Sequence, residues 1–241
     1  MTQDRIYSVP LSHVGDFEFD DAVADVFPDM IRRSVPGYGS MLSMIAQTTE
    51  RYSQTSSTLY DLGCSLGAGT VLLMQDAAAD CKVIAVDCSA AMISKLNARL
   101  AEVRATGAEA TTVLADIRDV EISNASVVVL NLTLQFLPPE ERTTLIQKVV
   151  AGMRPGGALL LSEKICFEDA AQQKLMTDLH HDFKRAHGYS DLEIAQKRTA
   201  IENRLVPETL TTHVERLRHA GFSSVAPWFQ CFNFSSILAV K

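Results

Sequence analysis

Residues 59–70 read Leu-Tyr-Asp-Leu-Gly-Cys-Ser-Leu-Gly-Ala-Gly-Thr, an apolar run that leads through a glycine-rich turn into helical sequence. Gly63 and Gly67 have no Cβ, so the backbone can pass close to a ligand, and a helix beyond them begins with unpaired N–H groups. We therefore predict a buried strand, a turn that carries a nucleoside cofactor, and a helix. An ordinary glycine turn of an α/β protein is the alternative.

Asp61 ends this strand two residues before the first glycine. Ser65 stands where the dinucleotide fingerprint G-x-G-x-x-G has its second glycine, which disfavours a nicotinamide dehydrogenase. A carboxylate at position 61 would repel a pyrophosphate and suits a ligand that bears an ammonium group. The pattern resembles the first motif of the class I S-adenosylmethionine-dependent methyltransferases, D/E-x-G-x-G/S-x-G.

Length and composition restrict the class of protein. The 241 residues suffice for one α/β domain with an appended helical part, so residues 1–241 are expected to form a single domain. A net charge of −7 gives no basic field for phosphates and disfavours direct binding of nucleic acid. Without a secretion signal or an apolar run long enough to span a bilayer, we expect a cytoplasmic protein with no membrane partner.

Metal and disulfide chemistry are not indicated. The five cysteines, at positions 64, 81, 88, 166 and 231, are odd in number and form no C-x-x-C pair, which fits reduced thiols. His180 and His181 are adjacent and cannot both face one ion from a helix. We therefore expect no metal.

Alternating apolar runs and helical sequences predict a mostly parallel, doubly wound sheet with a Rossmann-like order. After the first strand, runs at 82–87, 110–115, 126–130 and 158–164 form four more, with right-handed crossovers between them. Residues 207–222 form a last helix, and 224–229 with 231–240 close a seven-stranded sheet as an antiparallel hairpin.

Two helical segments lie outside this repeat. Residues 1–57 form an N-terminal helical cap, in which Asp20 or Asp21 caps a short helix and a second helix follows Tyr38 from about residue 40 to 52. Residues 167–205 form a helical insertion after the fifth strand. This insertion is either a solvated helical pair or an arm that contributes to a dimer and to the active site.

Polar side chains end the later strands. Asp87 follows the second strand some two dozen residues after the glycine turn, where a carboxylate can accept hydrogen bonds from two ribose hydroxyls. Capping of the next helix is the alternative role for this acid. Asp116 and Ile117 follow the third strand and Asn131 follows the fourth, so all are expected at one crevice.

Longer blocks resemble one family, the carboxy-S-adenosyl-L-methionine synthases of bacterial wobble-uridine modification. The resemblance covers nearly the whole chain and is carried by residues 26–31, 33–38, 60–68, 131, 133–137, 161–164, 181–186, 188–190, 196–198 and 228–234. It implies a class I methyltransferase fold and an enzyme that converts S-adenosyl-L-methionine and prephenate into carboxy-S-adenosyl-L-methionine and phenylpyruvate. It also implies a partner enzyme that uses this product on tRNA.

The resemblance implies particular contacts with the cofactor. Asp116 and Ile117 lie where class I methyltransferases hold the adenine, and Cys88 replaces an asparagine that is common in the family. Arg198 is implied to reach over from the neighbouring subunit of a homodimer and, with Tyr38, to form the catalytic pair. The full set of implied cofactor contacts is Tyr38, Gly63, Cys64, Ser65, Asp87, Cys88, Asp116, Ile117, Asn131 and Arg198.

A carboxylate on the transferred carbon explains a cation at the site. Arg198 can hold it with two parallel N–H bonds and Tyr38 can add a hydroxyl donor, at about 1.5–3 kcal/mol per charged hydrogen bond. Tyr38 can equally be an aromatic residue that packs at a helix start. Arg33, Arg185 and Arg198 are all candidates for binding prephenate.

The family chemistry needs no protein base. The sulfonium acidifies its methyl group, and loss of a proton to prephenate's departing group gives an ylide that captures carbon dioxide if water is excluded. Two other functions fit the same fold. They are a conventional methyltransferase acting on a small carboxylic acid and a non-catalytic scaffold that binds the cofactor.

Overall fold

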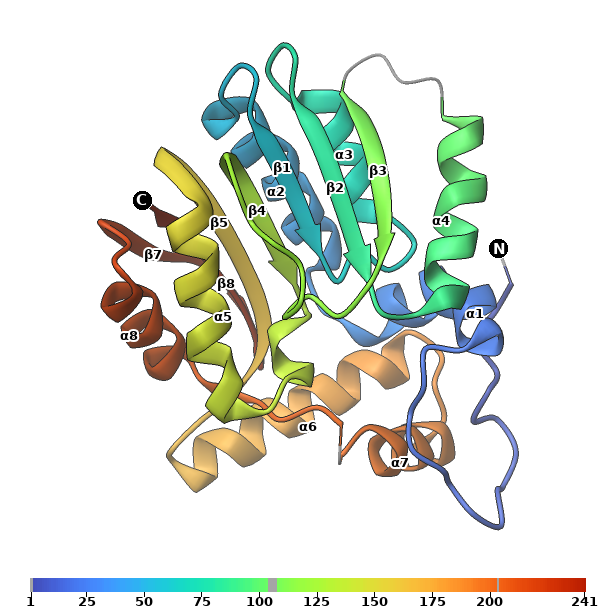
Figure 1. Ribbon diagram of the computed structural model, residues 1–241. Coiled ribbons are helices and arrows are strands. Elements are labelled where there is room, and N and C mark those ends of the chain that lie inside the picture. Colours follow the sequence, from blue (N-terminus) through green and yellow to red (C-terminus); the bar gives the residue numbers. More distant parts are fainter. Residues whose placement is uncertain (1, 104–107, 203) are drawn as a thin grey trace.

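The computed structural model describes residues 2–103, 108–202 and 204–241, and its centre is one sheet with helices on both faces (Figure 1). Residues 1, 104–107 and 203 belong to the predicted cap, the second crossover and the insertion, and they lie outside this description. Across the described ranges, none of the helices has the length and apolar character that a membrane span requires.

The strand order is β3-β2-β1-β4-β5-β8-β7. The bounds are β1 Thr58–Leu62, β2 Lys82–Asp87, β3 Glu109–Leu114, β4 Ala125–Asn131, β5 Met153–Cys166, β7 Ser224–Cys231 and β8 Phe234–Val240. The first five pair in parallel, and β8 is antiparallel to both β5 and β7. The predicted parallel sheet with an antiparallel C-terminal hairpin is therefore confirmed, and a two-residue strand, β6 (Glu208–Thr209), adds to the end of β5.

Helices cover both faces of the sheet. One face packs on α5 (Pro139–Gly152) and α8 (Leu210–Ala220), and the other on α2 (Tyr38–Tyr52), α3 (Ala68–Asp76) and α4 (Ala90–Glu102). Neighbouring residues of β1 point to opposite faces, and both Leu59 and Tyr60 are almost fully buried. A strand covered on both sides has to be apolar along its length, which explains the continuous run in the sequence.

Helices of the cap and the insertion gather at the carboxyl edge of the parallel strands. Figure 1 shows α1 (Asp21–Ser34), α6 (Ala170–Ala186) and α7 (Asp191–Ile201) at the arrowhead end of β1, β2 and β3. The predicted helical insertion is thus confirmed. Asp20 caps α1, since its carboxylate accepts a 2.8 Å hydrogen bond from the backbone N–H of Val23.

The first helix of the cap contains a proline in its interior. α1 continues through Pro28 to Ser34. Met30 is 3% exposed, and the Arg33 guanidinium donates to the backbone carbonyls of Asp4 (3.1 Å) and His187 (2.7 Å). These tertiary contacts hold the second half of the helix and outweigh the cost of an internal proline, about 3 kcal/mol.

The bounds of β5 and of the last helix differ from the prediction. β5 is longer than residues 158–164, because Met153 pairs with Ala125 of β4 and Cys166 pairs with Thr209 of β6. The last helix begins at Leu210 and not at residue 207, since the two preceding residues are engaged in that short pairing. Both corrections arise from strand pairing between distant segments, which local periodicity does not reveal.

Candidate active site at the carboxyl edge of the sheet

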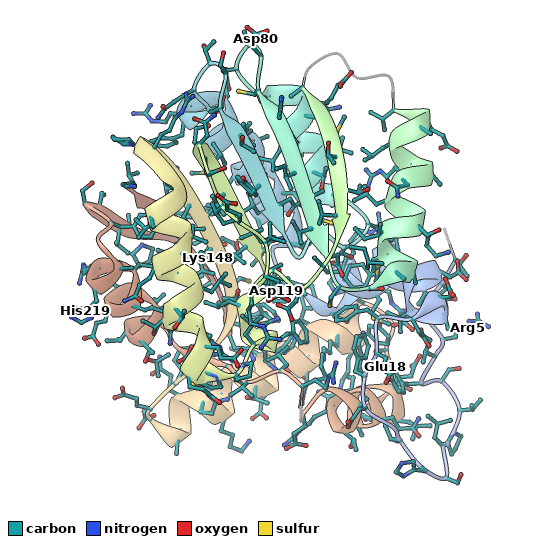
Figure 2. The ribbon with its side chains drawn as sticks, in the orientation of Figure 1. Arg5, Glu18, Asp80, Asp119, Lys148 and His219 are labelled. Carbon is teal, nitrogen blue, oxygen red and sulfur yellow. The ribbon has the colours of Figure 1, made fainter. Side chains whose placement is uncertain are left out.

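The side chains predicted to follow the strands do lie at one edge. Leu62 pairs with Val86, and Asn131 pairs with Ser162, so the parallel strands end side by side. Asp119, in the loop after β3, lies near this carboxyl edge in Figure 2, whereas Asp80 lies at the opposite edge of the sheet. Ligands of open α/β sheets bind at the carboxyl edge, which makes it the candidate site.

The glycine turn is held by β2. Backbone N–H groups of Gly63 and Cys64 both donate to the Val86 carbonyl, at 2.8 and 2.9 Å. Gly63 has a φ of +82°, and a Cβ there would lie 2.3 Å from the hydroxyl oxygen of Thr133. The glycine is therefore required by packing inside the chain, a reason that the sequence pattern did not reveal. Ser65 also has a positive φ, of 49°, and completes the turn.

Asp87 fastens this turn to the next helix. Its carboxylate accepts one hydrogen bond from the Ser65 N–H (2.8 Å) and one from the Ser89 N–H (2.9 Å), through different oxygens. The N-cap of α4 is Ser89 itself, whose hydroxyl accepts from the Met92 N–H. Each carboxylate oxygen has two acceptor positions, so each keeps one for a ligand hydroxyl. Burial raises the pKa of Asp87.

Asp61 is enclosed beneath the turn. It is 3% exposed and accepts a 2.7 Å hydrogen bond from the Thr70 hydroxyl at the start of α3. Burial, with the Asp87 charge adding to it, raises the pKa of Asp61 to about 6. Tyr38 lies close enough that burial and the Asp61 carboxylate together raise the pKa of its phenol to about 12. The fold thus brings the first residue of α2 to the glycine turn.

Asn131 has a side-chain oxygen that is buried and has no hydrogen-bond partner among the described residues. Buried polar atoms in native proteins are nearly always paired, so an orphaned acceptor at a strand end fits a ligand that carries N–H donors. S-adenosylmethionine carries such donors on its amino group. The residue types at this edge therefore fit that ligand.

Asp116 and Ile117, the two predicted adenine contacts, have different surroundings. Asp116 is bound by Arg118, with 2.6 Å between the guanidinium and a carboxylate oxygen, and this partner lowers the pKa of Asp116. Arg118 also contacts Glu141. Ile117 is 6% exposed and packs into the main core, so the protein itself covers most of its side chain. Cys88 is exposed beside Asp87.

Arg198 is exposed on α7, in a hollow between α6 and α7 that His181 also lines. The other two candidate arginines are engaged. Arg33 pairs with Asp29 (3.1 Å), and Arg185 pairs with Asp182 and Asp191 (both 2.7 Å). Within the described ranges Arg198 has no carboxylate at ion-pair distance.

Glu163 is a residue of this edge to which the sequence analysis gave no role. It is buried on β5 and accepts the backbone N–H groups of Leu134 (2.8 Å) and Gln135 (2.9 Å). It therefore fixes the short 3-10 helix η1 (Leu134–Phe136), which follows Asn131. Burial raises the pKa of Glu163 to about 8. An acid within an apolar strand was the available signal.

This sheet order, with a glycine turn after β1 and acids after β2 and β3, defines the class I S-adenosylmethionine-dependent methyltransferase fold. Residues 59–157 match the methyltransferase domain family. The magnesium protoporphyrin IX methyltransferase of Synechocystis PCC 6803 with bound SAH has a similar structure, with a TM-score of 0.61 at 17% identity. The likeness covers 94% of this chain and 89% of that one.

Two relatives identify the family within this class. A carboxy-S-adenosyl-L-methionine synthase of Vibrio parahaemolyticus is 54% identical over 239 residues, which are 99% of this chain and 97% of the relative. A synthase of the same name from Geobacter is 55% identical over 239 residues, covering 99% and 98%. The chain belongs to the carboxy-S-adenosyl-L-methionine synthase family. Among the described residues there is no group of three or more His, Cys, Asp or Glu that could hold a metal ion.

Proposed function

We propose that this chain converts S-adenosyl-L-methionine and prephenate into carboxy-S-adenosyl-L-methionine and phenylpyruvate. Beside the family relationship, the observation that carries the proposal is the unpaired cation Arg198 on the helices that cover the carboxyl edge. A conventional methyl donor carries a positive sulfonium, which a cation would repel, whereas a product with a new carboxylate would attract it.

The residues at the edge support a position for the nucleoside. Asp87 keeps two acceptor sites for the ribose hydroxyls, Asp116 accepts from the adenine amine, and the Asn131 oxygen accepts from the amino group. Gly63, Cys64 and Ser65 present the backbone of the turn. When bound, S-adenosylmethionine supplies a sulfonium that acidifies its methyl group. No side chain of the edge is needed as the base.

The atoms of the reaction balance without an external reactant. Prephenate loses its ring carboxylate as carbon dioxide and its ring hydroxyl as hydroxide, which leaves phenylpyruvate. The hydroxide takes one proton from the methyl group and becomes water, and the methyl carbon forms a bond to the carbon dioxide. Exclusion of bulk water from the edge protects this step, and α1, α6 and α7 lie in the position to provide it (Figure 1).

Arg198 and Tyr38 would bind the new carboxylate. The Tyr38 pKa of about 12 keeps its phenol protonated at neutral pH, so it remains a hydrogen-bond donor. We propose that Arg198 acts across a homodimer interface, since it is exposed on α7. Two exposed leucines support a partner surface there, namely Leu175 of α6 (54% exposed) and Leu192 of α7 (38% exposed).

The product would serve a second enzyme. We propose a cytoplasmic tRNA carboxymethyltransferase that transfers the carboxymethyl group to wobble uridine. The net charge of −7 fits a protein that supplies a small molecule and does not itself bind tRNA.

Mass spectrometry of the reaction products tests the proposal. With S-adenosylmethionine and prephenate, the protein should form a nucleoside heavier by one carbon dioxide, and Arg198→Ala should reduce its formation about 100-fold if two charged hydrogen bonds are lost. Arg218→Ala, at an exposed position of α8 outside the hollow that Arg198 lines, is the matched control and should retain activity. Accumulation of S-adenosylhomocysteine, or full activity of Arg198→Ala, would contradict the proposal.

A further inference from the structure

Three lysines from distant parts of the chain converge next to the candidate site. Lys164 lies at the end of β5, Lys184 in α6 and Lys197 in α7. We call them the lysine cluster. Lys164 and Lys184 are half-buried, and Lys197 is 7% exposed. Lys164 and Lys197 both lie close enough to Lys184 that their charges disfavour the charged form of Lys184.

A chain of direct contacts connects the three elements. Lys164 pairs with Phe234 of β8, and the Phe234 ring meets the ring of His180 edge-on, with 5.1 Å between centroids. His180 Nε2 lies 2.7 Å from the Ser34 carbonyl oxygen, and Lys197 donates to the Ser34 hydroxyl at 3.0 Å. His180 precedes Lys184 by one turn of α6, so both side chains lie on the same side of that helix.

The cluster borders the residues proposed to hold the nucleoside. Lys164 follows Ser162 by two positions, so both side chains lie on one face of the sheet, and Ser162 pairs with Asn131. Phe234 packs in one apolar group with Tyr38 and with Leu132, the neighbour of Asn131. A ligand above the ends of β4 and β5 can therefore reach both the cofactor residues and the lysines.

The charges of the cluster are not balanced within the chain. In the part of the chain that the structure describes, Lys164 and Lys184 have neither a carboxylate within 4.0 Å nor a side-chain hydrogen bond. Lys197 lies 3.6 Å from Asp4, whose carboxylate also accepts the Tyr189 hydroxyl.

The surroundings of the cluster lower the pKa values of its lysines and of the neighbouring histidines. Burial, followed by repulsion from Lys197 and Lys164, lowers the pKa of Lys184 to about 7. Burial and Arg198 lower the pKa of Lys164. His180 remains neutral, since burial lowers its pKa to about 2, and burial also lowers the pKa of His181. Half-buried cations without partners are costly, and an anionic ligand would remove that cost.

We propose that Lys164 and Lys184 bind the carboxylate of the dicarboxylate co-substrate that remains on the keto-acid product. This inference rests on the proposed function, which supplies a substrate with two carboxylates. Cations bound to the carboxylate that departs would stabilise the ground state and oppose loss of carbon dioxide. Cations on the retained carboxylate hold the substrate without that penalty. The keto-acid product should therefore bind to the same lysines.

The test is the affinity of prephenate and phenylpyruvate for Lys164→Gln and Lys184→Gln. Each substitution should raise the KM for prephenate and the Kd of phenylpyruvate about tenfold, the loss expected for one charged hydrogen bond. The Kd of S-adenosylhomocysteine should not change. Lys174→Gln is the matched control, because Lys174 lies on the same helix, 77% exposed and paired with Asp178.

The pH dependence gives a second measurement. Lys184 is charged below its pKa of about 7, so the KM for prephenate should rise as the pH increases through this value. Lys184→Arg, which stays charged, should bind prephenate and remove this rise. Thermal melting checks that each variant is folded.

The possible failures are distinguishable. If the unaltered protein forms carboxy-S-adenosyl-L-methionine but both glutamine variants bind phenylpyruvate as tightly as it does, the inference is wrong and the proposed function stands. If the unaltered protein forms no carboxylated nucleoside from prephenate, both the proposed function and the inference are wrong. An equal loss of S-adenosylhomocysteine affinity in the variants would also overturn the inference, since it would indicate a structural role.

Discussion

Replacement of Asp87 by Asn should destabilise the protein even without a ligand. Two backbone N–H groups, of Ser65 and Ser89, bond to separate oxygens of this carboxylate at 2.8 and 2.9 Å. An amide retains one oxygen and turns an NH₂ group toward the other donor, so one charged hydrogen bond is lost and the second becomes neutral. The expected loss is about 2 kcal/mol. For a chain of this length that lowers the melting temperature by about 4–8 °C.

Thermal melting with and without S-adenosylhomocysteine separates the two roles of Asp87. The ligand should also bind Asp87→Asn about 10- to 100-fold more weakly, since the acceptors for the ribose are altered. Asp25→Asn is the control, because this exposed residue of α1 is not among the proposed cofactor contacts and its pair with Lys95 is of the exposed kind that contributes about 0–1 kcal/mol. An unchanged melting temperature for ligand-free Asp87→Asn would refute the argument that this carboxylate fastens the glycine turn.

Three further predictions concern packing and accessibility. Gly63→Ala should lower stability by about 2–4 kcal/mol, from its positive φ and its contact with Thr133, whereas Gly15→Ala, in open space, should change the melting temperature little. Arg142→Met should cost about 3–5 kcal/mol in denaturant unfolding, because it removes one of the two arginine partners of Glu208 and leaves several buried carbonyls without their donor. Cys88 should be alkylated in the native protein and protected by S-adenosylhomocysteine in peptide mapping; equal labelling with and without ligand would contradict its place at the site.

The order and type of the elements could be predicted because their signals are local. The apolar run before Gly63, the acids that end the first three strands and the cap at Asp20 depend on neighbours within a few residues. The pairing that lengthens β5 could not be predicted, since it joins segments that lie far apart in the sequence.

Part of the candidate site could likewise be predicted from the sequence, and part could not. The location of Asp87 and Asn131 at the carboxyl edge could be predicted because both residues end strands, where the sheet itself determines the position. The lysine cluster could not, since Lys164, Lys184 and Lys197 come from three elements and form no sequence pattern. Their proximity depends on how α6 and α7 fold back over β5.

Native mass spectrometry of the freshly purified protein reports the bound small molecule and the number of subunits together. We expect a dimer that carries a nucleoside heavier than S-adenosylmethionine by one carbon dioxide. A protein that carries only S-adenosylmethionine or S-adenosylhomocysteine, even after incubation with prephenate, would contradict this expectation.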